Sequence, residues 1–149
     1  MNKKLLMGVT AFCAMGFFGS AWATDFGTAA EAKMMLEKAV AAVQADEAKA
    51  LEAFTKGEGG FKEKDLYVFC GGPDGNFTAH PKLVGKSLKD LKDKSGKALG
   101  EAMYKDAKEG EIVEVTYMWP RPGEEKPSEK VAYVEKVGDQ ICAVGYYKP

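Results

Sequence analysis

Residues 67–81 constrain the fold more than any other stretch, because they have the pattern of a β-hairpin. Residues 67–70 (Tyr-Val-Phe-Cys) are aromatic, β-branched or apolar, as in a strand with at least one buried face. Residues 71–75 (Gly-Gly-Pro-Asp-Gly) are all turn formers. Residues 76–80 alternate polar and apolar side chains, and Pro81 ends the second strand because proline cannot donate to a ladder. The stretch therefore predicts two antiparallel strands joined by a short turn.

The first 23 residues have the pattern of a secretory signal peptide. Lys3 and Lys4 supply positive charge, residues 5–18 are apolar, and residues 21–23 (Ala-Trp-Ala) fit the small-x-small cleavage pattern. We expect cleavage to leave residues 24–149 as one exported domain with one core; an uncleaved anchor is the alternative. No later stretch is apolar enough to cross a bilayer, so membrane insertion of the mature chain is not expected.

Charge and cysteine content restrict the partners and the compartment. The chain has 21 basic and 22 acidic residues, and loss of the leader removes two of the lysines. Interspersed charges with a negative sum argue against nucleic acid or an anionic membrane as a partner. Cys70 and Cys142 are the cysteines beyond the leader, and an even pair in an exported protein favours a disulfide. Two buried thiols or an intermolecular bridge are the alternatives.

The longest periodic segment runs from Thr28 to Phe54, with apolar residues at spacings of three and four. It predicts a long amphipathic helix that begins with a capping box of Thr28 and Glu31, and its polar residues 44–47 indicate a break or bend. A second amphipathic helix is expected at residues 97–109. Three prolines at 120–127 indicate a connection outside the ladder. With the hairpin, five strands are expected, the last three at residues 112–119, 130–136 and 140–147.

Several ordered motifs resemble single-Cache (Cache type 2) extracellular sensor domains, which are PAS-like. The matching segments cover about residues 60–148: they are 74–81 (DGNFTAHP), 83–86 (LVGK), 88–93 (LKDLKD), 117–123 (YMWPRPG), 130–134 and 144–147. The resemblance implies an α+β fold with a five-stranded antiparallel sheet, a long N-terminal helix and a helical crossover. In that topology the first and last strands are neighbours, which places Cys70 near Cys142.

The resemblance also implies a function. Such domains bind small organic acids or related metabolites outside the membrane, in chemoreceptors and histidine kinases. No transmembrane helix follows Pro149, so a free-standing periplasmic binding protein is expected. Its expected signalling or uptake partner is a membrane receptor or a histidine kinase. The alternative is an interaction module with a collapsed pocket that docks on such a partner without a ligand.

The candidate ligand-binding residues are Tyr117, Trp119, Lys130, Tyr133 and His80. Aromatic side chains with a few donors are typical of small-molecule sites, and a carboxylate needs a cation, here Lys130. This set, without inward carboxylates, suits a short monocarboxylate such as acetate, pyruvate or propionate. The competing interpretations are sheet packing for the aromatic residues and a turn-fixing role for His80. Arg121, between two prolines, is interpreted as solvated. We expect no metal, no cofactor and no enzymatic activity, because no Ser, Cys or carboxylate pair has a partner base at a spacing that a catalytic motif would show.

Overall fold

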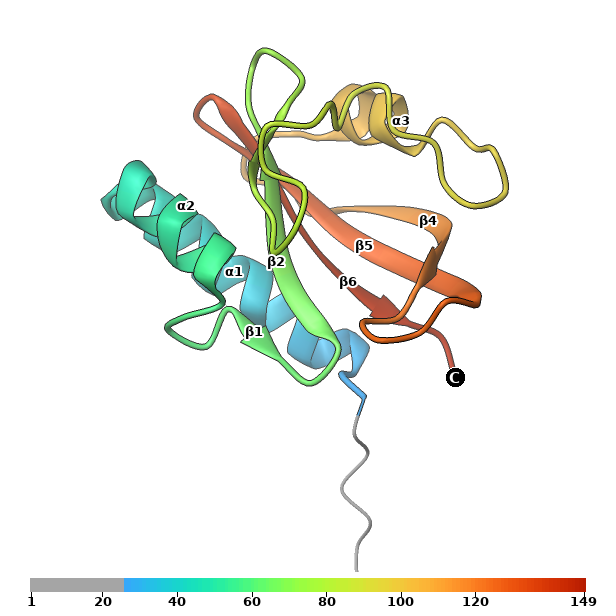
Figure 1. Cartoon of the computed structure of the whole chain (residues 1–149). Helices are drawn as coiled ribbons and strands as arrows, with labels where there is room; N and C mark the ends of the chain where they lie inside the picture. Colours follow the sequence, from blue (N-terminus) through green and yellow to red (C-terminus); the bar gives the residue numbers. More distant parts are fainter. Residues whose placement is uncertain (1–25) are drawn as a thin grey trace, which may run out of the picture.

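The helix predicted from Thr28 to Phe54 is two helices in the computed structural model, which describes residues 26–149 (Figure 1). The first, α1 (Ala29–Ala45), begins at Thr28, whose hydroxyl accepts a hydrogen bond from the Glu31 amide in a capping box. Asp46 then adopts extended backbone, and its carboxylate caps α2 (Glu47–Lys56). The single long helix was therefore wrong, but the break lies within the polar residues 44–47.

The described residues form a sheet of six antiparallel strands, one more than predicted. The additional strand is the first, which has only two exposed residues and therefore no hydrophobic pattern. The spatial order is β1-β2-β6-β5-β4, with β3 paired to β2. The bounds are β1 (Lys62–Glu63), β2 (Leu66–Gly71), β3 (Phe77–Ala79), β4 (Val113–Pro120), β5 (Pro127–Val137) and β6 (Gln140–Tyr147).

Two further predictions change in detail. Pro120 and Pro127 face each other at the ends of β4 and β5, so they close this hairpin ladder and do not lie outside it. The helix predicted at residues 97–109 is the shorter α3 (Leu99–Asp106). Residues 108–111 form bridges instead, one of them to Lys136 on β5.

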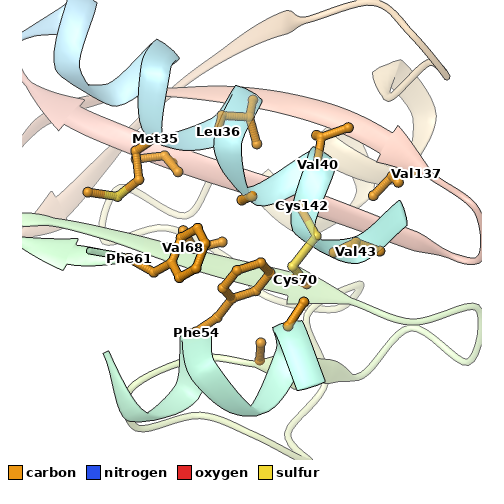
Figure 2. Close-up of a cluster of buried hydrophobic side chains, with 14 of the residues drawn as sticks. Met35, Leu36, Val40, Val43, Phe54, Phe61, Val68, Cys70, Val137 and Cys142 are labelled. Carbon is orange, nitrogen blue, oxygen red and sulfur yellow. A yellow bond between two sulfur atoms is a disulfide. The ribbon is translucent and has the colours of Figure 1, made fainter. Parts of the chain in front are cut away.

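The predicted hairpin of β2 and β3 is present, and β2 also pairs with β6 at the centre of the sheet. In that register Cys70 lies directly opposite Cys142, and a disulfide joins them, as predicted. Both cysteines are fully buried beneath α1 (Figure 2). The disulfide therefore crosslinks neighbouring central strands inside the core.

The sheet separates two hydrophobic clusters. α1 and α2 cover one face, and α3 with the crossover loop of residues 80–98 covers the other (Figure 1). The second cluster contains most of the aromatic residues of β2, β3 and β4, and it is the one that holds the candidate site.

The predicted signal peptide and its cleavage site lie outside the described residues. Within residues 26–149, no helix has the length and apolar character needed to cross a membrane.

Candidate functional site

Lys130 on β5 is a charged residue that packs against aromatic rings of the second cluster, and it is fully buried. Its stem passes over Gly145 of β6, where an added Cβ would lie 2.4 Å from Lys130 Cε. Its Nζ donates to the Tyr67 hydroxyl at 3.1 Å and lies 4.2 Å from the Tyr67 ring centroid and 5.0 Å from that of Tyr147. The ammonium is thus held among aromatic rings and one hydroxyl.

The positive charge of the Lys130 ammonium is not balanced by a directly paired negative charge. Burial lowers the pKa of Lys130 to about 7, although the charge of Asp65 acts in the opposite direction. Among residues 26–149, no carboxylate forms an ion pair with Lys130. A buried cation without an anion is costly, so the site is electrostatically prepared for an anionic group.

His80 follows β3 and is buried against the rings of Tyr67 and Phe77, with centroids 5.3 and 5.1 Å away. Its Nδ1 accepts a hydrogen bond from the Lys82 amide at 2.9 Å, so in the neutral ring Nε2 carries the proton. Burial, and then the charges of Lys130 and Lys82, lower the pKa of His80 to about 4. His80 therefore fixes the turn after β3 and also offers a neutral N–H donor.

A small cavity lies between β2, β3, β4 and the crossover. Its volume is about 10 Å³, which is room for about one water molecule. Three of the candidate ligand-binding residues line it together, His80, Tyr117 and Trp119. Lys130 does not line it, but donates to the hydroxyl of Tyr67, which does. The lining residues are Tyr67, Phe69, Phe77, His80, Leu83, Leu91, Leu99, Tyr117 and Trp119.

An outer groove of about 310 Å³ adjoins this cavity and shares four of its lining residues, Tyr67, His80, Leu83 and Trp119. Four cations line the groove and one acid does, Glu124. The cations are Lys62, Lys82, Lys94 and Arg121. Such a basic groove raises the local concentration of anions at the entrance to the cavity.

Asp93 holds the crossover loop against β4 and so shapes this groove. Its carboxylate accepts hydrogen bonds from the amides of Met118, Ser95 and Lys97, each at 2.8 Å. Burial raises the pKa of Asp93, but these hydrogen bonds outweigh it and lower the pKa to about 2. The anchored loop places Lys94 Nζ 5.5 Å from the ring of Trp119.

Tyr133 does not join the other candidates. It lies on the opposite face of β5, in the cluster beneath α1, with its ring 5.8 Å from that of Tyr146. The strand period of two explains this, because Lys130 and Tyr133 are three residues apart. The expectation that Tyr133 shares a pocket with Lys130 was therefore wrong.

Sequence reasoning missed Tyr67, which contacts both the cation and the cavity. Alternation along β2 was an available signal, since it places Tyr67 and Phe69 on the same face. Burial raises the pKa of Tyr67 to about 12, and a hydrogen bond from the Trp119 side chain opposes this only in part. The hydroxyl therefore keeps its proton at neutral pH. The leucines of the crossover had no such signal, because no ladder or helix fixes their direction.

Comparison with known proteins shows one family and one fold. A family model described as a Cache domain matches residues 31–147. Two solved structures each share 21% identity with this chain over 78% of its length, with TM-scores of 0.56. One describes carboxylic acid recognition by a Cache chemosensory domain and is covered over 86% of its length. The other is a periplasmic sensor domain of a chemotaxis protein, covered over 88%. These similarities confirm the predicted α+β, PAS-like Cache fold.

Proposed function

This chain belongs to the Cache domain family, and on that basis we propose that it is a sensory module that binds a short monocarboxylate such as acetate, pyruvate or propionate. The proposal includes export to the periplasm and a membrane receptor or histidine kinase as the partner that receives the signal. It includes no catalytic step, in keeping with the ligand-binding role of the family. A structural relative described for carboxylic acid recognition supports the ligand class.

The observation that carries the proposal is the buried Lys130 ammonium, which has a single hydrogen-bond partner among the described residues, the neutral Tyr67 hydroxyl. A carboxylate nearby would supply the missing negative charge. The tyrosine hydroxyl accepts from Lys130, which leaves its own proton free to be donated to a ligand oxygen. In this arrangement Lys130 acts through Tyr67 and does not need to enter the cavity.

We place the carboxylate where the cavity and the groove meet, at the side chains that line both. Tyr67, His80 and Trp119 each carry one O–H or N–H donor there, which suits the acceptor oxygens of a carboxylate. The alkyl end would extend toward Leu83 and Leu91, which line the cavity and are half-buried. Because the cavity holds only about one water, binding requires these side chains to shift.

A thermal-shift comparison of propionate with propionamide tests the proposal. The two differ in charge and are similar in size, so only propionate is expected to raise the melting temperature, by mass action on the folded state. Lys130→Met is expected to abolish this shift, and Lys94→Met, at an exposed lysine of the groove, is the matched control that retains most of it. Stabilisation by amines or sugars alone would contradict the assignment.

The second candidate function is the ligand-independent interaction module, and the nearly filled cavity favours it. In that case Tyr117, Trp119 and His80 serve as core residues, and the partner recognises the surface. The same experiment separates the two candidates. The interaction module is supported if no small metabolite raises the melting temperature of the wild type or of the Lys130→Met variant.

A further inference from the structure

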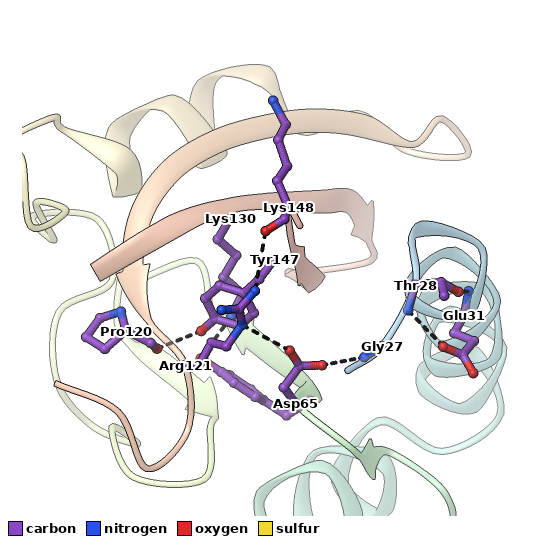
Figure 3. A network of polar contacts seen from close by, with 10 residues as sticks. Gly27, Thr28, Glu31, Asp65, Pro120, Arg121, Lys130, Tyr147 and Lys148 are labelled. Carbon is purple, nitrogen blue, oxygen red and sulfur yellow. Dashed lines mark hydrogen bonds and ion pairs between the residues drawn. The ribbon is translucent and has the colours of Figure 1, made fainter. Parts of the chain in front are cut away.

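Arg121, expected from the sequence to be solvated, is mostly buried at the centre of a polar network (Figure 3). Its side chain is only 17% exposed. The guanidinium lies 4.5 Å from the ring of Phe26 and 5.1 Å from that of Tyr147, and its Nη2 donates to the Lys148 carbonyl at 3.3 Å. Arg121 also lines the outer groove, so one residue contacts both the groove and the segment that precedes α1.

Asp65 is the anionic partner of Arg121, but the two are poorly matched. Asp65 Oδ2 lies 3.7 Å from Arg121 Nε, too far for a hydrogen bond. Both atoms are buried, and neither has a hydrogen-bond partner within residues 26–149. The other oxygen, Oδ1, accepts from the Gly27 amide at 2.6 Å. No hydrogen bond joins the two charges to offset their desolvation, so an anion that accepts hydrogen bonds from the guanidinium can compete with Asp65 for it.

The turn that contains Asp65 also holds the start of α1. The neighbouring Lys64 forms an ion pair with Glu31 at 2.7 Å, and Glu31 closes the capping box with Thr28. The turn between β1 and β2 thus contacts Arg121 on one side and the first turn of α1 on the other (Figure 3). A movement of Arg121 could therefore be transmitted to the start of α1 through the turn formed by Lys64 and Asp65.

We propose that Asp65 and Arg121 form an exchangeable ion pair that couples the outer groove to the segment in front of α1. The carboxylate of a ligand bound where the groove meets the cavity takes the Arg121 guanidinium from Asp65. Phe26 then loses the cation on its ring, and Asp65 is left as a buried charge without its ion-pair partner. Hydration of Asp65 relieves that cost and breaks its hydrogen bond to Gly27. The ligand arm of this inference rests on the proposed carboxylate function; the coupling itself does not.

Hydrogen exchange of the Gly27 amide, followed by NMR of ¹⁵N-labelled protein, tests the coupling without a ligand. Arg121→Gln is expected to accelerate this exchange about ten-fold or more, the usual range for losing a hydrogen bond to a charged group. Lys94→Gln removes another groove cation, one that forms no ion pair with Asp65 among the described residues, and is expected to leave the exchange unchanged. Equal exchange in the two variants would refute the coupling.

A second variant separates coupling from simple loss of structure. In Arg121→Gln combined with Asp65→Asn, the amide oxygen still accepts from Gly27, but no buried charge remains to be hydrated. Exchange at Gly27 is expected to return close to the wild-type rate, while the amides of β6 stay protected in all variants. If the double variant exchanges as fast as Arg121→Gln, the ion pair is only a structural contact and the inference is wrong.

Propionate serves as the probe for the ligand arm, with sodium chloride at matched ionic strength as the control. It is expected to accelerate Gly27 exchange in the wild type and to have no effect on exchange in the double variant. Propionate that raises the melting temperature without changing Gly27 exchange would overturn the coupling and leave carboxylate binding intact. Propionate that does not raise the melting temperature would overturn the proposed function, and the variants alone would then decide the coupling.

Discussion

Replacing Lys130 with methionine is expected to change how the stability of the protein depends on pH. In the folded state the pKa of Lys130 is lowered by burial from its usual 10.5 to about 7, so folding favours the neutral amine. At about 1.4 kcal/mol per pH unit, this difference makes the charged form cost roughly 5 kcal/mol of folding free energy. The cost is fully present below about pH 7, where Lys130 is charged in both states.

The sign of the pH dependence follows from proton counts. Between about pH 7 and pH 10 the unfolded chain keeps a proton that the folded chain has lost, so the free energy of unfolding rises with pH by up to about 1.4 kcal/mol per unit. The neighbouring titratable groups His80 and Tyr67 do not titrate in the folded protein between about pH 7 and pH 9. The pKa of His80 is lowered to about 4, and burial raises that of Tyr67 to about 12.

Urea unfolding of the oxidised protein at pH 7, 8 and 9, followed by circular dichroism, measures this slope. Lys130→Met is expected to lose it and, near pH 6, to be more stable than the wild type by roughly 3 kcal/mol, after allowance for the lost hydrogen bond to Tyr67. Lys94→Met, at an exposed lysine, is expected to keep the wild-type slope. Parallel stability profiles for the wild type and Lys130→Met would refute the reasoning.

Three further predictions concern the disulfide, the site and its ligand. Replacing both Cys70 and Cys142 with alanine is expected to lower the free energy of unfolding by about 4 kcal/mol, given their separation of 72 residues; intact mass after alkylation without reductant checks the bridge, because uptake of two alkyl groups would contradict it. Gly145→Ala is expected to displace the stem of Lys130 and to cost about 1–3 kcal/mol in the same urea assay, since its Cβ would lie 2.4 Å from Lys130 Cε. Propionate binding is expected to weaken by up to about ten-fold per pH unit above pH 7, because the carboxylate favours the charged amine; calorimetric titration at several pH values measures this, and a pH-independent affinity would exclude Lys130 from the site.

Local patterns in the sequence determined the elements that carry their own signals. The hairpin of β2 and β3 follows from an apolar run, a group of turn formers and a proline stop, all within 15 residues. The start of α1 follows from the pairing of Thr28 with Glu31, and the break after it from the polar residues 44–47. These features depend on neighbours in the chain, so the residue order alone is enough to predict them.

The family motifs extended this prediction to topology. They implied that the first predicted strand and the last are neighbours, which correctly placed Cys70 near Cys142. Composition alone left this pairing open, because two cysteines in an exported chain also allow free thiols or an intermolecular bridge.

Only the tertiary structure decided what the site contains. Alternation along β5 separates Lys130 from Tyr133, but which of the two lies beneath α1 depends on how the strand packs. The burial of Lys130 depends on Gly145 of the adjacent strand leaving space for its stem. The pairing of Asp65 with Arg121 joins a turn and a proline-flanked loop that lack any common sequence pattern. Such contacts join residues distant in the chain, and their geometry is set by the packing of whole strands and loops, which local propensity does not encode.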